Sequence, residues 1–189
     1  MQKEKELVIN IIAEAFEENQ SVNYVVKQDA KRKKRIRSLI DYSYEICKKY
    51  GEVIVNEERT AVALLNFPLG KKNPLFTISQ DIRLVVKSIG VKRLSLVLKR
   101  ESIIKKNHPG QAFCHLWYIG VSKNSQGQGI GTKLLETIIR KYDALGMPIY
   151  LETSMPENVP WYEKNGMEVY KEIKDFEFTT YLIKRSLKV

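Results

Sequence analysis

Residues 112–154 read AFCHLWYIGVSKNSQGQGIGTKLLETIIRKYDALGMPIYLETS. The first ten residues have little polarity, which is typical of a strand that is buried on both faces. A glycine-rich turn follows, and apolar side chains then recur at helical spacing at Leu134, Leu135, Ile138, Ile139 and Tyr142. Gly146 ends this helix, and PIYLETS (148–154) is a second strand of the buried type. We therefore expect a mixed α/β fold with this strand–turn–helix–strand unit at its centre.

The segments that flank this unit alternate between helical and extended patterns. Helical spacing predicts helices over residues 3–18, 30–49, 74–106 and 158–166. The third of these is interrupted at Gly90, and FEENQSVN (16–23) ends the first. Alternating or apolar runs predict a hairpin over 51–68 and a final pair of strands over 167–173 and 176–186.

Length and composition limit the class of protein. The chain has 189 residues, 43% of them hydrophobic, and these values suit one globular domain with a substantial core. No apolar stretch is long enough to span a membrane, and the N-terminus does not resemble a signal peptide. The chain has two cysteines and two histidines, which argues against a disulfide framework, a zinc site or a Ser-His-Asp triad. We expect a cytoplasmic protein.

The basic excess is partly clustered. The chain carries a formal net charge of +10, and two runs, KRKKRIR (31–37) and KRESIIKK (99–106), hold much of it. Such runs attract polyanions, namely nucleic acid, an anionic membrane or a phosphorylated cofactor, or they form a solvated helix face. Apolar residues at helical spacing follow the first run, and no known nucleic-acid motif accompanies it, so the helix-face interpretation is favoured.

The turn between the strand and the helix predicts an anion site. Gly127, Gly129 and Gly131 alternate there, and glycine allows a positive φ and a close approach of a ligand to the backbone. The first turn of the following helix has unsatisfied N–H groups and a partial positive charge. This arrangement favours a binding site for phosphate or pyrophosphate over a plain tight turn without a ligand.

Two common phosphate motifs fit less well. The GxxxxGK[ST] pattern of a P-loop is absent. A dinucleotide fingerprint requires GxGxxG, but Thr132 stands where its last glycine would be. Glu152, at the end of the next strand, lies about where a ribose-binding acid is expected in such a fold. The chain nevertheless lacks the further strand–helix repeats of a dinucleotide domain.

A family resemblance decides between these ligands. GVSKNSQGQGIGTKLLE (120–136) resembles the acetyl-CoA-binding motif Q-x-x-G-x-G/A of the GNAT superfamily of N-acetyltransferases, with Gln126, Gly129 and Gly131 in the motif positions. LETSMPENVPWYEKNGM (151–167) resembles the second half of the same fold, and is particularly similar to puromycin N-acetyltransferase and related small-molecule acetyltransferases.

The resemblance implies an architecture and an activity. It implies an α/β (α+β) fold whose central, mostly antiparallel sheet of about six or seven strands splays between the strands near 113–121 and 148–153 and is flanked by helices. Residues 1–189 would form one acetyltransferase domain, with acceptor-side helices and a first hairpin in 1–110 and the acetyl-CoA-binding half in 111–189. The implied reaction is acetyl transfer from acetyl-CoA to a primary amine of a small molecule in a ternary complex. No metal, nucleic acid or membrane is implied, and the protein would be a monomer or homodimer.

The resemblance also implies roles for individual residues. The pantetheine arm would hydrogen-bond to the backbone of the strand at Ile119, Gly120 and Val121, and Asn158 would contact the same arm. The pyrophosphate would bind the backbone N–H groups of Gln126, Gly127, Gln128, Gly129, Ile130, Gly131 and Thr132. Tyr162 would protonate the departing CoA thiolate, a role that competes with that of a core tyrosine.

The base and the acceptor pocket are less well defined. Glu152 is a candidate base or amine-orienting carboxylate, because a charge within IYLETS needs a partner if it is buried. His115 and water are alternatives, and Cys114 suits a core position better than that of a nucleophile. The acceptor pocket is expected from residues 16–50 and 74–106, with candidate linings Tyr24, Tyr42, Tyr44 and Phe76. A CoA-binding sensor without turnover and a nucleic-acid-binding module remain alternative functions.

Overall fold

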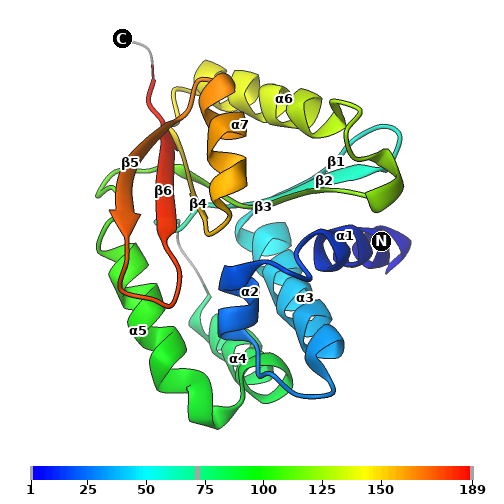
Figure 1. The fold of residues 1–189 in the computed structure, drawn as a ribbon, viewed down its shortest axis with the longest axis vertical. Helices are drawn as coiled ribbons and strands as arrows, with labels where there is room; N and C mark the ends of the chain where they lie inside the picture. The colour runs from blue at the N-terminus through cyan, green and yellow to red at the C-terminus, as the bar shows by residue number, and fades with distance from the viewer. Residues whose placement is uncertain (1, 71–72, 188–189) are drawn as a thin grey trace.

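The computed structural model describes residues 2–70 and 73–187, so the two ends of the predicted domain lie outside the described residues. Within this part of the chain, a six-stranded sheet lies between two groups of helices (Figure 1). The strands are β1 (Gly51–Val55), β2 (Ala61–Asn66), β3 (Cys114–Val121), β4 (Ile149–Thr153), β5 (Glu168–Ile173) and β6 (Thr180–Arg185). The helices are α1 (Gln2–Ala15), α2 (Gln20–Val25), α3 (Arg32–Tyr50), α4 (Pro74–Leu84), α5 (Leu94–Lys105), α6 (Ile130–Ala144) and α7 (Val159–Lys164).

The sheet is open between β3 and β4. The strand order is β1-β2-β3-β4-β6-β5, and every neighbouring pair is antiparallel except β3–β4, which is parallel. That pair holds only two register positions, Cys114 with Ile149 and His115 with Tyr150. Beyond His115 the two strands diverge. The predicted mixed sheet with a splay at these strands is confirmed.

A bulge in β3 changes which face its side chains cover. Leu64 pairs with Tyr118 and Leu65 pairs with Leu116, so Trp117 is the extra residue. Leu116 packs in the core under α6 and α7, whereas Tyr118, two residues later, packs in the core under α1 and α3. Strict alternation would put both on one face. A bulge re-aims side chains in this way, and it bends the strand where the sheet opens.

Each face of the sheet has its own core. On one side Ile12, Ile36, Ile40 and Tyr44 of α1 and α3 are almost wholly buried. On the other side Leu135, Ile138 and Tyr142 of α6 pack with Leu151 and Tyr162. These positions are the helical-spacing residues that the sequence shows, so burial of the amphipathic faces fixes α3 and α6 on the sheet.

Most predicted elements are present with shifts of a few residues. The long helical pattern over 74–106 divides into α4, a π-helical turn η1 (Val85–Ile89), a short 3-10 helix η2 (Val91–Arg93) and α5. Gly90 lies between these pieces with φ of +78°, which glycine adopts readily. Helix α2 is not predicted from the sequence, because Asn19 is interpreted there only as part of the segment that ends α1. The Asn19 side chain accepts a hydrogen bond from the Val22 N–H and caps the next helix.

Candidate active site

The glycine loop presents free backbone donors. Gly127 and Gly129 have φ of +75° and +74°, and Gly129 caps α6 without a side-chain hydrogen bond. Among the described residues, no acceptor takes the backbone N–H groups of 127–132. The Gln126 N–H differs, since it lies 3.5 Å from the Lys123 carbonyl. Six consecutive amides at the start of a fifteen-residue helix are therefore available to an anion, and the anion site itself stays a prediction.

The absence of a side chain has different consequences at the three glycines of the loop. A Cβ built on Gly127 or Gly129 meets no protein atom within 4 Å, so these positions border open space. A Cβ on Gly131 would lie 3.2 Å from Cγ2 of Val121 and 3.8 Å from Trp161. Gly131 therefore allows α6 to pack closely on the end of β3, whereas the first two glycines leave room outside the loop.

The open edge of β3 offers an extended ligand a place to add. The Ser122 N–H donates to the Thr60 carbonyl across β2–β3, at 2.8 Å. Backbone groups alternate along a strand, so those of Gly120 also face β2, while those of Ile119 and Val121 face the gap towards β4. The Val121 carbonyl accepts a hydrogen bond of 3.2 Å from the Gln126 side chain. The N–H groups of both residues and the Ile119 carbonyl stay available.

Gly120 has a packing role in the structure. Its backbone groups face β2, and a Cβ on it would lie 3.1 Å from Ile12 and 3.3 Å from Ala15 of α1. The absence of a side chain lets α1 approach the strand. Gly120 therefore helps α1 to pack on β3, and its predicted contact with the cofactor stays a prediction.

Asn158 and Tyr162 lie on the opposite side of the gap. Asn158 is exposed at the start of α7, and its side chain has no hydrogen bond to another described residue. Tyr162 is buried, and no described residue hydrogen-bonds to its hydroxyl. Burial raises the pKa of Tyr162 above its ordinary value, so the phenol stays protonated. Trp161 donates to the Thr132 hydroxyl at 3.0 Å and so ties α7 to the start of α6.

One cavity connects these elements to the helices of the N-terminal part. Its volume is about 1370 Å³, and its wall includes Val121, Gly129, Asn158 and Tyr162. The same wall continues over α1–α5 and reaches Glu152. Of the four aromatic residues predicted to line an acceptor pocket, only Tyr42 does so. Tyr24, Tyr44 and Phe76 are not part of the wall.

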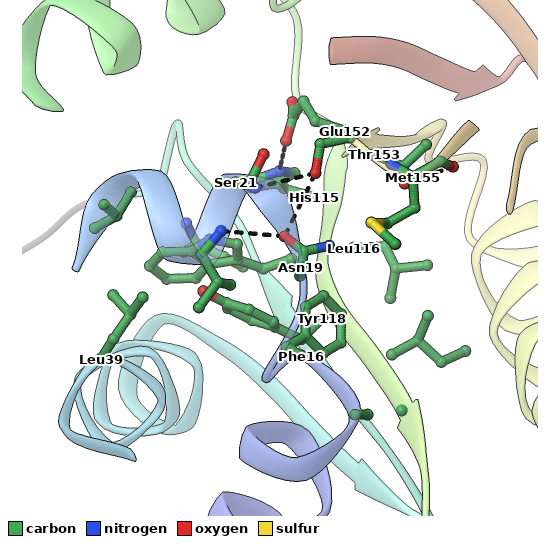
Figure 2. A pocket seen from close by; sticks show the side chains of 18 of the residues that line it. Phe16, Asn19, Ser21, Leu39, His115, Leu116, Tyr118, Glu152, Thr153 and Met155 are labelled. Atoms are coloured by element: carbon green, nitrogen blue, oxygen red, sulfur yellow. Dashed lines mark hydrogen bonds and ion pairs between the residues drawn. The ribbon is translucent and has the colours of Figure 1, made fainter. Parts of the chain in front are cut away.

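At the inner end of the cavity, Glu152 lies between the two histidines of the chain (Figure 2 shows Glu152 with His115). Its Oε1 is 2.6 Å from Nε2 of His108, and its Oε2 is 2.7 Å from Nε2 of His115. Burial by itself would raise the pKa of Glu152, but the two imidazoles lower it below its ordinary range. Glu152 is therefore an ionised carboxylate that accepts hydrogen bonds from both rings.

This arrangement fixes the protonation of the rings. A carboxylate can only accept hydrogen bonds, so each histidine carries its proton on Nε2. The ionised carboxylate would also stabilise positive charge on either ring. The three ligand atoms lie within 4.8 Å of one another, which is also compatible with a metal ion, but the two hydrogen bonds satisfy the same atoms without one.

Sequence reasoning found Glu152 and His115 but gave His108 no role. His108 follows α5, 44 residues before Glu152, and nothing in its local sequence indicates the contact. Cys114 is fully buried, and burial raises the pKa of its thiol to about 12. A thiolate nucleophile is therefore disfavoured at this position, and the expected core role of Cys114 is confirmed.

A second polar group holds the N-terminal helices against β4. Ser154, directly after β4, accepts a hydrogen bond of 3.1 Å from the Ser21 N–H and lies 3.5 Å from the Asn19 side chain. These contacts place the start of α2 next to the end of the strand that carries Glu152. The segment that ends α1 thus forms part of the wall of the site.

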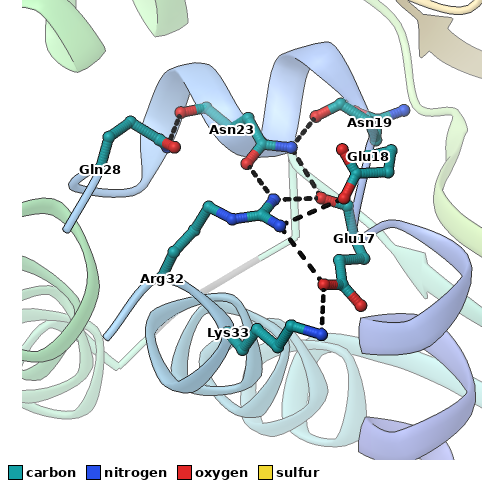
Figure 3. Close-up of polar contacts among 7 residues, drawn as sticks. All are labelled: Glu17, Glu18, Asn19, Asn23, Gln28, Arg32 and Lys33. Carbon is teal, nitrogen blue, oxygen red and sulfur yellow. Dashed lines mark hydrogen bonds and ion pairs between the residues drawn. The ribbon is translucent and has the colours of Figure 1, made fainter. Parts of the chain in front are cut away.

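The basic run 31–37 is largely neutralised within the protein. Arg32 bonds to the Glu17 carbonyl at 2.7 Å and to Asn23 at 2.9 Å, and pairs with Glu17 and Glu18 (Figure 3). Lys33 also pairs with Glu17. Arg35 and Arg37 pair in the same way with Asp29 and Glu6. The run joins α3 to α1 and α2, which supports the helix-face interpretation over nucleic-acid binding.

Arg32→Ala should lower the free energy of unfolding by about 1–2 kcal/mol, because a part-buried guanidinium then leaves several acceptors without a donor. Urea denaturation of both proteins measures this. Lys34→Ala is the control, since Lys34 is exposed and has no ion pair with another described residue. Equal stability of the two variants would contradict the structural role of Arg32.

In a comparison with models of known protein families, residues 94–167 match the model of the Acetyltransferase (GNAT) family. This segment, here called the GNAT segment, therefore resembles GNAT acetyltransferases. The GNAT segment runs from α5 through α7 and contains the glycine loop and the Glu152 cluster. An uncharacterized N-acetyltransferase of Schizosaccharomyces pombe is 46% identical over 61 residues, which are 31% of this chain and 24% of that protein. The narrower resemblance to puromycin N-acetyltransferase stays a prediction.

Solved structures described as acetyltransferases share the fold over nearly the whole chain. One from Corynebacterium glutamicum, described as histone acetyltransferase HPA2 and related acetyltransferase, has a TM-score of 0.69 and 18% identity and covers 100% of this chain and 94% of that chain. Arylalkylamine N-acetyltransferase 2 from Aedes aegypti has a TM-score of 0.65 and 13% identity, with coverages of 100% and 96%. The architecture outside the GNAT segment is therefore also that of this fold.

Proposed function

We propose that the protein is an acetyl-CoA-dependent N-acetyltransferase that acetylates a primary amine of a small molecule by direct attack in a ternary complex. The observation that carries the proposal is one cavity that joins the free amides of the glycine loop, the open edge of β3 and the Glu152–histidine cluster. Along the cavity, the protein thus offers in order a partner for a diphosphate, a partner for an extended amide arm, and an acceptor for a proton.

Cofactor binding follows from the backbone. The amides of 127–132 bind the pyrophosphate, helped by the positive end of α6. The pantetheine arm adds to β3 as an extra strand at Ile119 and Val121, because β4 has already diverged there. Asn158 offers its free side-chain amide from the other side of the gap. The residues present therefore fit acetyl-CoA, which supplies an activated acetyl group as a thioester.

The reaction needs few further groups, because positioning accounts for much of the rate in such a transfer. The neutral amine attacks the thioester carbonyl, and its proton passes to the histidine cluster held by Glu152. A backbone N–H of the open strand stabilises the carbonyl oxygen as charge develops on it. The C–S bond then breaks, and Tyr162 donates its proton to the thiolate sulfur. Cys114 takes no part.

The charge of the cavity supports an amine acceptor. Its charged lining consists of five acids and two bases, although the chain as a whole carries +10. The acids are Glu18, Asp81, Glu101, Glu152 and Glu157. Such a lining attracts a cationic amine before it loses its proton. The name of the Aedes aegypti protein, an arylalkylamine N-acetyltransferase, agrees with a small amine, whereas the Corynebacterium glutamicum title raises a protein amine as the alternative.

Calorimetric titration with acetyl-CoA and a thiol-release assay over a panel of amines test the proposal. Saturable acetyl-CoA binding with amine-dependent release of CoA is expected. Acetyl-CoA binding without release of CoA for any amine or lysine peptide would indicate a CoA-binding sensor without turnover. Binding of NADH in place of acetyl-CoA would favour a dinucleotide site. Release only with lysine peptides would move the acceptor from small molecules to proteins.

Tyr162→Phe should lower kcat about 10- to 100-fold and leave the affinity for acetyl-CoA unchanged, because only the proton donor to the thiolate is lost. Steady-state kinetics and calorimetry separate the two effects. Thermal stability should change little, since the hydroxyl has no hydrogen bond to a described residue. Tyr181→Phe, outside the cavity, is the control. An unaltered kcat in Tyr162→Phe would remove the tyrosine from the acid role.

A further inference from the structure

The outer face of α4 and the turns after it expose large apolar side chains. Of the ten large hydrophobic residues that are clearly exposed in the described chain, eight lie within residues 69–98. Helix α4 has no buried residue. Leu75, Ile78, Ile82 and Val86, here called the apolar stripe, follow one another at spacings of three and four residues and are 54–79% exposed. They therefore share one face of the helix.

The stripe does not belong to the acceptor site. None of its four residues lines the cavity, whereas Asp81, Leu84 and Val85 of the same segment do. The inner face of this segment thus serves the cavity, and the stripe points away from it. Figure 1 shows α4 and α5 together at the end of the molecule remote from α6 and α7.

Most of the net charge of the protein lies in the same region. Residues 69–106 contain ten Lys or Arg and two acids, a net of +8 in a chain of +10. Five exposed lysines have no ion pair with another described residue, namely Lys87, Lys92, Lys99, Lys105 and Lys106. This contrasts with the basic run 31–37, whose arginines pair with acids. The region therefore combines uncompensated positive charge with exposed aliphatic surface.

These two properties together select the partner. A second copy of the chain would bring two sets of these exposed lysines face to face, so self-association there is opposed. A nucleic acid would satisfy the lysines, but it offers nothing apolar to the aliphatic stripe. An anionic lipid surface satisfies both, since lysines bind its headgroups while apolar side chains enter the boundary with the acyl chains.

We propose that α4 docks on an anionic membrane surface, with the apolar stripe in the headgroup region and the neighbouring lysines on the lipid headgroups. No helix of the described residues has the length and apolarity to cross a bilayer, and the proposal needs none. The expectation of no membrane partner rests on the missing spanning segment and does not address a helix that lies on the surface. Docking in this way would place the acceptor end of the cavity beside the bilayer.

Vesicle flotation of the full chain tests the proposal without any need for turnover. The probes are phosphatidylcholine vesicles with about 30% phosphatidylserine and vesicles of phosphatidylcholine alone, at about 0.15 M salt. The variants are L75S/I78S/I82S for the stripe and K87E/K92E for the charge. Because all five side chains are exposed, the folded structure should persist, and thermal melts check this. Leu145→Ser is the matched control, since Leu145 is 62% exposed and lies directly after α6.

The wild type and Leu145→Ser should float with the anionic vesicles only, and each multiple variant should lose about tenfold or more of the apparent affinity. Absence of flotation with anionic vesicles would overturn the proposal, as would flotation that neither variant reduces. A concentration-dependent dimer in light scattering that L75S/I78S/I82S abolishes would assign the stripe to a second copy of the chain. Binding to RNA that K87E/K92E removes, without flotation, would assign the lysines to nucleic acid.

Discussion

Gly129→Val should abolish acetyl-CoA binding, with a loss of affinity of about 100-fold or more. Gly129 has φ of +74° and caps α6, and a Cβ there meets no protein atom within 4 Å. The valine therefore fits the protein, and its methyl groups occupy the space in which the diphosphate would approach the free amides. Calorimetric titration with acetyl-CoA measures the loss directly.

Backbone strain at a positive φ is the competing cause, and Gly146→Val isolates it. Gly146 has φ of +62°, its Cβ also meets no atom within 4 Å, and it lies at the other end of α6. Both variants should lose similar stability, but Gly146→Val should bind acetyl-CoA like the wild type. Normal binding by Gly129→Val, or an equal loss in both variants, would contradict the role of the loop.

Glu152→Gln should lower kcat by about 10²–10³-fold, because the histidine cluster loses the charge that stabilises it when it accepts the proton of the amine. Acetyl-CoA affinity should be unchanged, since the proposed cofactor site consists of backbone groups elsewhere in the cavity. Glu157→Gln is the control, as Glu157 is an exposed acid on the same wall. Turnover of Glu152→Gln within twofold of the wild type would exclude the cluster from the reaction.

Acid unfolding gives a readout of the same carboxylate that does not depend on activity. The histidines lower the pKa of Glu152, so the folded state favours its ionised form. The contribution of this carboxylate to stability is complete at a pH above about 4.5, which is the ordinary pKa of the side chain. It is lost as the pH falls below that value. The unfolding free energy of Glu152→Gln should therefore depend less on pH in this range.

The fold of the proposed cofactor half was predictable because its signals are local. Three alternating glycines between a buried strand and an amphipathic helix require an unusual backbone, and Gly127 and Gly129 adopt it. The orientation of Ile119 and Val121 towards the gap follows from the same strand pattern. The contact of Gly120 with the cofactor stays a prediction, and its packing against α1 could not be foreseen, because that helix is more than a hundred residues away in the chain.

The acceptor half was less predictable because its contacts are long-range. Helical spacing located α3 and α5, but it could not show which of their aromatic residues face a cavity and which pack in the core, so Tyr44 and Tyr42 were indistinguishable. The contact between His108 and Glu152 joins the loop after α5 to strand β4, 44 residues later in the chain. Neighbouring residues carry no pattern that indicates such a meeting; only the scarcity of histidine in the chain makes its pairing notable.

The central claim is that the amides of the glycine loop bind the diphosphate of acetyl-CoA. A titration of ¹⁵N-labelled protein with acetyl-CoA, followed through the backbone amide resonances, tests it most directly. The account predicts large shifts for Gly127, Gly129 and Gly131 that saturate together with the calorimetric binding curve, and none for Gly146. Saturable binding that leaves the loop amides unmoved would contradict it.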